Sequence, residues 1–229
     1  MPTAAELEAL RLSLKVATWA MLGSLPLAIA VAWALGRLRF PGRALLDAIV
    51  HMSLVLPPVA VGYLLLATLG ARAPIGHWLD AVFGIKLIFT AKGAAVAAAV
   101  MSFPLMVRAI RLSLDAVDPG LEAAARTLGA GRFDTFRSVT LPLMLPGILS
   151  GCVIAFASAL GEFGATITFV SNIEGETRTL PLAIYTATQT AGGDAVAIRL
   201  VMIAFALALA LLVLSEWIAR RVGRLIAGT

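Results

Sequence analysis

The chain has 229 residues, of which 60% are hydrophobic and only 14% are charged, and its mean hydropathy is +0.96. A soluble domain of this length cannot bury so much apolar surface, so the composition excludes a soluble globular protein and indicates a membrane protein. The net charge of +5 comes from residues that lie between apolar runs. It therefore reports orientation in the membrane and gives no indication of nucleic-acid binding.

Five apolar stretches, taken in chain order, are candidates for membrane-spanning helices, each of which needs about 20 apolar residues. Their residues are 16–36, 48–71, 93–107, 138–161 with a continuation over 163–173, and 200–215, whose helix we expect to begin near Asp194. The third is short and spans only if Lys92 and Arg108 snorkel from its ends. In the second, Pro57 and Pro58 predict a kink. We therefore predict an all-α polytopic membrane protein with about five spans, in a single domain over residues 1–229.

Two further segments are too short or too polar to span. Residues 179–193 carry several threonines and end at Gly192 and Gly193. We interpret this segment either as a re-entrant or interfacial helix that lines a cavity, where polar backbone is tolerated at membrane depth, or as a helix in a surface loop. Residues 81–91 are a weaker candidate for an additional membrane element.

The distribution of Lys and Arg residues predicts the orientation, because cytoplasmic loops carry an excess of both. Five spans place most of the arginines on one side, in the segments 37–43, 108–137 and 220–224. We therefore expect the N-terminus outside the cell and the C-terminus in the cytoplasm. The loop over residues 118–142 would then face the cytoplasm.

This loop, residues 118–142, is amphipathic although it lies between two apolar spans. Pro119 begins a helix with a short apolar face, and Gly129 and Gly131 end it with backbone that permits a tight bend. A second amphipathic piece follows at Phe133. Such a bent helix is suited to dock in a groove of a partner protein; the alternative is that it lies on the membrane surface.

The loop resembles the EAA motif of the membrane subunits of ATP-binding cassette (ABC) importers. That motif reads Glu-Ala-Ala, three residues, Gly, nine residues, Ile, one residue, Leu-Pro. The matching positions are Ala124, Ala125, Gly129, Val139, Leu141 and Pro142. The departure is at Ala123, where the family has Glu, and Glu122 lies one position earlier. This shift weakens the expectation that a carboxylate here contacts the ATPase, but not the docking geometry.

The resemblance implies the fold of type I ABC importer permeases and a coupling helix that inserts into a groove of a separate ATPase. A P-loop needs a Gly-Lys pair to cradle phosphates, and none of Lys15, Lys86 and Lys92 follows a glycine. We therefore expect no catalytic residue, no metal site and no cofactor in this chain. ATP and Mg²⁺ would be bound by the partner subunit.

A second resemblance covers residues 159–181, which are similar to the membrane subunits of molybdate importers, as is the Pro57-Pro58 segment. The block begins Leu160-Gly161-Glu162-Phe163-Gly164, and sulfate permeases share its looser Gly-Glu-aromatic-Gly pattern. The resemblance implies molybdate or tungstate as cargo, with a sulfate or thiosulfate permease as the alternative. It also implies a homodimer with the path at its interface, two ATPase subunits and an external molybdate-binding protein, in the bacterial inner membrane.

Polar residues of this block are candidates for the transport path or its gate. Ser158, Glu162 and Thr166 are spaced at i, i+4 and i+8, which places them on one face of a continuous helix. An ionised Glu162 would repel molybdate, so we favour a structural or gating role over direct lining of the path. Neutral donors for a passing oxyanion are offered by Thr166, Thr168, Ser171 and Asn172.

Two other classes of membrane protein are less well supported. An ion-coupled secondary transporter usually carries several intramembrane charges, whereas in this sequence Glu162 is the one acid well inside an apolar run. A membrane-anchored assembly protein has no use for a coupling-type loop. Co-purification of an ATPase would separate these classes from an ABC permease.

Overall fold

The computed structural model describes residues 3–227, with side chains in the last helix as far as Leu214 and again at Trp217. Within this part of the chain all regular structure is helical, and one segment, η1, is π-helical. The elements are α1 (Ala4–Arg37), α2 (Arg43–Val55), α3 (Pro58–Leu69), α4 (Pro74–Phe83), α5 (Ala91–Asp115), α6 (Pro119–Thr127), α7 (Arg132–Thr135), η1 (Phe136–Thr140), α8 (Leu141–Leu160), α9 (Gly164–Val170), α10 (Leu180–Gln189) and α11 (Asp194–Ala227).

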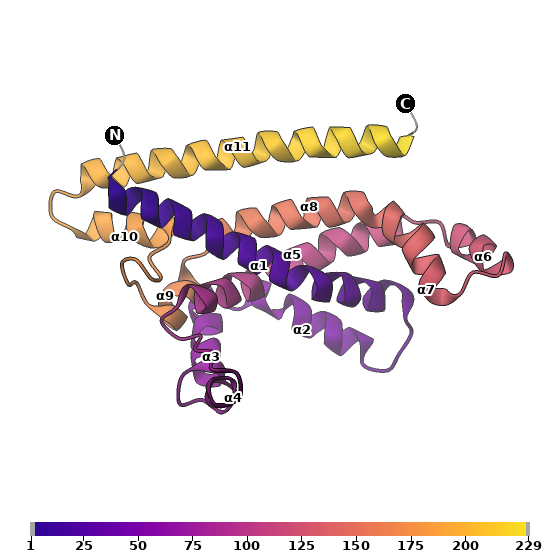
Figure 1. The fold of residues 1–229 in the computed structure, drawn as a ribbon, viewed down its shortest axis with the longest axis horizontal. Coiled ribbons are helices and arrows are strands. Elements are labelled where there is room, and N and C mark those ends of the chain that lie inside the picture. The colour runs from indigo at the N-terminus through magenta and orange to yellow at the C-terminus, as the bar shows by residue number, and fades with distance from the viewer. Residues whose placement is uncertain (1–2, 228–229) are drawn as a thin grey trace.

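Among the residues that the structure describes, four helices are long and apolar enough to cross a membrane: α1, α5, the continuous helix Arg132–Leu160, and Asp194–Leu214 of α11. The bent pair of α2 and α3 adds a fifth if it counts as one span. The prediction of an all-α polytopic protein with about five spans is therefore confirmed. In Figure 1, α6 and α7 lie at one end of the bundle, where α11 also ends, and α10 and the start of α1 lie at the other end.

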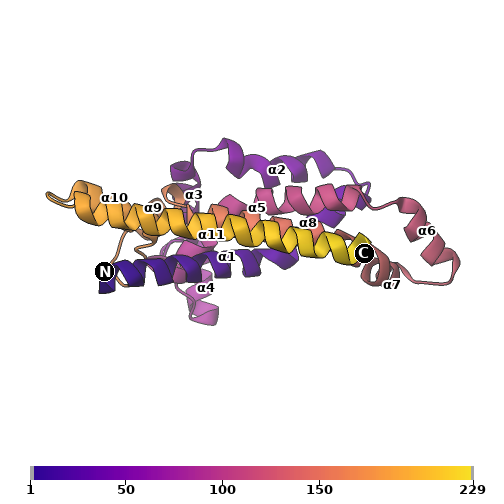
Figure 2. The ribbon, with the colours of Figure 1, turned by 90° about the horizontal axis from the view of Figure 1, so that it is seen from above.

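Helix α5 forms the centre of the bundle, because both α1 and α8 pack along it. Ala94, Ala97 and Ala98 of α5 are fully buried. A Cβ on Gly151 of α8 would come within 3.2 Å of the Met106 carbonyl oxygen of α5. Small residues permit this close approach, on which helix packing in lipid depends. Figure 2 shows the same bundle from the α11 side, with α1 and α2 on opposite flanks of α5.

The second apolar stretch is broken, where the sequence predicts only a kink. Helix α2 ends at Val55, α3 begins at Pro58, and the two axes are bent by 116°. Proline has no N–H to donate and disfavours helical backbone in the residue before it, so Pro57 is extended, with ψ 136°. Helix α2 therefore follows α5, while α3 turns away from the bundle axis (Figure 1).

The single helix predicted over residues 138–173 is wrong at both ends. The helix begins earlier, at Arg132, because α7, η1 and α8 continue into one another over 29 residues. It ends at Leu160, and α9 begins only at Gly164. The carboxylate of Glu162 in the break accepts the backbone N–H of Ala165, and such a local bond competes with continuation of the first helix.

The segment 179–193 contains α10, which packs against the start of α11. The shared apolar residues are Leu180, Ala183, Ala187, Ala197 and Leu200. Re-entry of this segment into the membrane stays a prediction. Residues 81–91 comprise the last turn of α4 and the loop after it, and α4 is a helix that the sequence reasoning did not anticipate.

Candidate functional site

The loop over residues 118–142 folds as the predicted helix, bend and second helix. Helix α6 begins with proline, and its N-cap Asp118 accepts the Gly120 N–H at 2.8 Å on Oδ1. A side-chain acceptor before a proline is a strong start signal for a helix. After α6 the chain bends at Gly129, whose φ of +92° is readily adopted by glycine alone. The loop thus presents a short helix at one end of the bundle.

The amphipathic loop exposes three large apolar side chains. Leu121 is 48% exposed, Leu128 88% and Phe133 73%. No residue of α6 is buried, so the helix contributes nothing to the protein core. Leu121 lies in α6, Leu128 directly follows it, and Phe133 lies in α7. Exposed apolar side chains on one loop indicate an interaction surface, and a helix set into a partner's groove is one way to cover it.

The positions of the EAA-like motif spread over α6, the bend, η1 and the start of α8. The exposed ones are Ala123, Ala124, Gly129 and Pro142, and the partly buried ones are Ala125, Val139 and Leu141. Their role in docking an ATPase stays a prediction, because it concerns contacts with a second protein.

Glu122 lies on the inner side of α6 and contacts the transmembrane helices. Its Oε1 accepts bonds from Arg37 Nε at 3.2 Å and from the Thr140 hydroxyl at 2.8 Å, and its side chain is only 13% exposed. The sequence reasoning missed Arg37 and Thr140 as partners. They lie 85 and 18 residues away from Glu122, and no spacing rule relates positions so distant.

The two broken stretches meet where α3 packs against α9. A Cβ on Gly62 of α3 would lie 2.6 Å from the Ala165 carbonyl oxygen and 2.8 Å from Thr168 Cβ. A Cβ on Gly164 of α9 would lie 2.8 Å from Pro58 Cβ. Only glycine permits this approach of two backbones. Non-helical backbone at membrane depth is found where it is covered by protein or lines a water-filled cavity, so this crossing is a candidate site.

The predicted polar stripe does not form as one continuous face. Ser158 lies near the end of α8, Glu162 in the break, and Thr166 in α9, so the i, i+4, i+8 geometry of one helix does not apply. Glu162 is half-buried and its Oε1 accepts the Ala165 N–H at 2.8 Å, at the first turn of α9. A carboxylate suits this position, because the backbone N–H groups of a helix start are unsatisfied.

The remaining predicted path residues differ in how their polar groups are used. Thr166 is 1% exposed, and the Thr168 hydroxyl donates to the Gly164 carbonyl at 2.8 Å. Ser171 is exposed and ends α9 with φ +65° and ψ −164°, a backbone conformation that costs a non-glycine residue about 1–3 kcal/mol. Strain of this kind is concentrated at functional sites, which favours a role for the α9 end.

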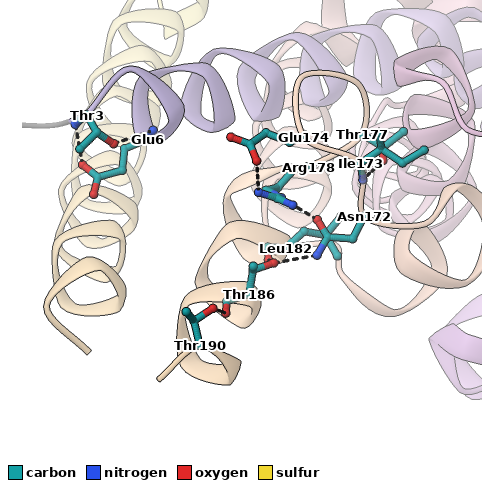
Figure 3. Close-up of polar contacts among 10 residues, drawn as sticks. All are labelled: Thr3, Glu6, Asn172, Ile173, Glu174, Thr177, Arg178, Leu182, Thr186 and Thr190. Carbon is teal, nitrogen blue, oxygen red and sulfur yellow. Dashed lines mark hydrogen bonds and ion pairs between the residues drawn. The ribbon is translucent and has the colours of Figure 1, made fainter. Parts of the chain in front are cut away.

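Asn172 belongs to a polar network beside α10 (Figure 3). Its Nδ2 donates to the Thr186 hydroxyl at 2.7 Å, and its Oδ1 accepts from Arg178 Nε at 3.0 Å. Arg178 also pairs with Glu174 at 2.8 Å. With Glu6 of α1, Arg178 and Thr186 contribute to the lining of a cavity of about 230 Å³. The amide of Asn172 is thus engaged within the chain and orders the connection between α9 and α10.

Comparison with known proteins defines the class to which this fold and loop belong. Residues 24–224 match the family described as the inner membrane component of binding-protein-dependent transport systems, so the chain belongs to that family. Its helices are accordingly those of a multi-pass inner membrane protein.

Similarity to individual proteins is high over nearly the whole chain. The chain is 60% identical over 223 residues to the molybdenum transport system permease protein ModB of Escherichia coli K12, covering 96% of this chain and 97% of that one. It is 54% identical to the ModB protein of Haemophilus influenzae over 217 residues, 95% of each chain. The sulfate transport system permease protein CysT of E. coli is 40% identical over 159 residues, 69% of this chain and 57% of that one.

Solved structures with low sequence identity share the fold. A bacterial ABC transporter that imports alginate matches with a TM-score of 0.78 at 17% identity, over 96% of this chain and 80% of that one. An inward-facing methionine ABC transporter matches with a TM-score of 0.67 at 17% identity, over 95% and 94%. The fold is therefore that of ABC importer permeases, as the EAA-like spacing predicts.

Proposed function

We propose that this chain is the transmembrane subunit of an ATP-driven importer of molybdate, or of the similar oxyanion tungstate. The observation that carries the proposal is the identity of 60% to a molybdenum transport permease over 96% of the chain. The exposed loop at one end of the bundle supports the coupling part of the proposal, since it offers an uncovered apolar surface at Leu121, Leu128 and Phe133. The chain forms the path and transmits loop movement to it.

The energy for transport comes from a separate subunit that binds ATP and Mg²⁺. This chain has no Gly-Lys pair from which a P-loop could be built. It acts as a permease without catalytic residues, metal or cofactor of its own. The coupling loop over residues 118–142 docks into that ATPase, and nucleotide-driven closure of the ATPase pair rocks the helices between inward-open and outward-open states.

The loop, the α11 end and the arginine-rich segments lie in the cytoplasm, and the N-terminus lies outside. This orientation is supported by the excess of Arg residues in segments 37–43 and 108–137. Two copies of the chain form a dimer with the path at their interface. A binding protein outside the membrane delivers the cargo; the alginate importer is itself described in complex with its periplasmic protein.

The path passes the region where the two broken helices cross. The residues assigned to the path or its gate are Ser158, Glu162, Thr166, Thr168, Ser171 and Asn172. The close contact of Gly62 with α9 and the strained backbone of Ser171 support a gate here. Among these residues Ser171 is exposed, and its neutral hydroxyl suits an oxyanion that must be released again.

Sulfate is a second candidate cargo, because the sulfate permease CysT is 40% identical over 159 residues. Molybdate and sulfate are both tetrahedral dianions, so one fold can serve either. The longer and closer match to ModB favours molybdate.

Uptake of radiolabelled molybdate at nanomolar concentration, in cells with and without the gene, tests the proposal. The strain should lack other molybdate systems, and excess sulfate serves as competitor. We expect deletion to abolish uptake, a plasmid copy to restore it, and sulfate to leave it unchanged. Unchanged molybdate uptake in the deletion strain would contradict the proposal, and loss of sulfate uptake instead would identify a sulfate permease.

A further inference from the structure

The inner side of the coupling helix carries a contact that joins it to three transmembrane helices. We propose that Glu122 is a positioning residue which, through Arg37 and Thr140, makes α6 move as one body with α1, α5 and α8. The inference rests on the proposed function, in which α6 docks into the ATPase. It assigns the transmission of movement to particular side chains inside this chain.

One carboxylate oxygen forms the centre of the contact. Glu122 Oε1 accepts both the Arg37 Nε–H at 3.2 Å and the Thr140 O–H at 2.8 Å. The Glu122 and Arg37 side chains are 13% and 19% exposed, and Thr140 is buried. Hydrogen bonds to a charged group that is shielded from water are stronger than those on an open surface. These hydrogen bonds therefore fix α6 against the transmembrane helices.

Arg37 extends the contact to the end of α5. Its Nη2 donates to the carbonyl oxygens of Leu114 at 3.1 Å and Val117 at 3.2 Å. A guanidinium at a helix C-terminus satisfies carbonyls that lack partners and interacts favourably with the helix dipole. The forked group thus binds the last turn of α5 with one nitrogen and α6 with another, from its own place at the end of α1.

Thr140 connects the contact to the helix that continues into α8. It closes the π-helical segment η1, in which the Leu141 N–H bonds the Phe136 carbonyl. π-Helical turns inside long helices are frequent at functional sites. The Phe136 ring meets Trp33 of α1 edge-on, with centroids 6.2 Å apart, so a second contact joins η1 to α1 at the same level.

Few other interactions fix α6 against the bundle. The helix has nine residues, none of them buried, and helices so short are not stable by themselves in water. Its large apolar residue, Leu121, is 48% exposed. Glu122 faces inward while the apolar docking surface faces outward, so the two functions of α6 use different sides. Loss of the Glu122 carboxylate should leave docking of α6 into the ATPase intact. It should weaken the coupling between movement of α6 and movement of the transmembrane helices.

The test uses the full transporter, purified with its ATPase and reconstituted into lipid vesicles with the binding protein. Two quantities are measured: the amount of ATPase that co-purifies, and the molybdate imported per ATP hydrolysed. We expect Glu122→Gln to retain the ATPase and to lower import per ATP about fivefold, a change typical of coupling residues. Arg37→Lys should act similarly, and the double variant should be little worse than either single one, because both remove one shared contact.

Asp47→Asn is the matched control. It removes the ion pair between Asp47 of α2 and Arg111 of α5, whose Oδ1–Nη1 distance is 3.0 Å, and which does not involve α6. This variant should import as much molybdate per ATP as the unchanged protein. Thr140→Val removes one hydrogen bond to the Glu122 carboxylate without altering charge, and it replaces Glu122→Gln in the test if that variant does not accumulate. It too should lower import per ATP and retain the ATPase.

Three results would overturn the proposal. If Glu122→Gln and Thr140→Val import normally per ATP, the contact transmits nothing. If Glu122→Gln loses the ATPase during purification, the carboxylate belongs to the docking surface. If Asp47→Asn is impaired equally, any inter-helix ion pair matters and Glu122 has no special role. Absence of ATPase binding and transport in the unchanged protein would instead refute the proposed function, and this inference with it.

Discussion

At the scale of residues, two glutamates have different structural roles. Glu122 joins the coupling helix to Arg37 and Thr140, whereas Glu162 starts α9 by accepting the Ala165 N–H. Both residues are conspicuous in the sequence. Glu122 lies one position before the Glu of the EAA motif, and Glu162 is an acidic residue in an apolar run. The sequence could not indicate their partners, because those depend on how helices distant in the chain pack together.

The role of Glu162 leads to a prediction about stability. Glu162→Ala removes the acceptor of the Ala165 N–H, one residue before the N-cap of α9, and should cost about 1 kcal/mol of unfolding free energy, similar to the loss of a helix cap. Glu162→Gln keeps an oxygen in place and should cost less. Thermal unfolding of the purified protein in detergent measures both, with Ser150→Ala, an exposed position on α8, as control. Equal stability of the Ala and Gln variants would show that the hydrogen bond from the Ala165 N–H does not stabilise the fold.

At the scale of elements, the breaks in two apolar stretches decide the geometry of the candidate path. The doubled proline gave a signal for the first break, although only a kink was inferred and the structure has a bend of 116°. The second break has a weaker signal, Gly161 and Gly164 on either side of Glu162, and the hydrophobic residues around them favoured one long helix. Hydropathy indicates which segments are buried in lipid or protein. It does not indicate where a backbone N–H forms a hydrogen bond with a side chain in place of the helical hydrogen bond.

The packing of α3 on α9 predicts opposite outcomes for two glycine substitutions. Gly62→Ala places a Cβ 2.6 Å from the Ala165 carbonyl oxygen and should destabilise the protein by about 1–3 kcal/mol, typical of overpacking. Gly23→Ala in α1 meets nothing within 4 Å and should be neutral or stabilise by up to about 1 kcal/mol, since alanine favours helices. Melting temperatures of the two purified variants give the comparison. A Gly62→Ala variant as stable as Gly23→Ala would refute the close α3–α9 contact.

At the scale of the whole molecule, the bundle has a packed centre at α5, and the loop over residues 118–142 exposes apolar side chains at one end. The sequence predicted the all-α class, about five spans and the bent helix at residues 118–142, because hydropathy, proline and glycine positions are local signals. It did not predict α4, the early start of the helix at Arg132, or the partners of Glu122. Those depend on tertiary contacts, in which a residue's neighbours in space are remote in the chain.

Because apolar side chains of the loop are exposed, substitutions there should impair assembly with the ATPase without affecting folding of the permease. Leu128 is 88% exposed, so Leu128→Asp should leave the melting temperature of the permease unchanged within a few degrees. If the loop docks into the ATPase, a carboxylate at this position should abolish co-purification of the ATPase, because burying an unpaired charge in an apolar interface is strongly unfavourable. Asp134→Asn, an exposed change on the same loop, is the control. Full retention of the ATPase by Leu128→Asp would contradict docking at this surface.

ATP-driven transport of molybdate by this chain is tested by molybdate uptake into vesicles that contain the purified permease and its ATPase, with the binding protein outside and ATP inside. We predict uptake that requires ATP and the binding protein, that excess sulfate leaves unchanged, and that Leu128→Asp abolishes. Uptake that proceeds without ATP, or that is driven by an ion gradient alone, would contradict the account and identify a transporter of a different class.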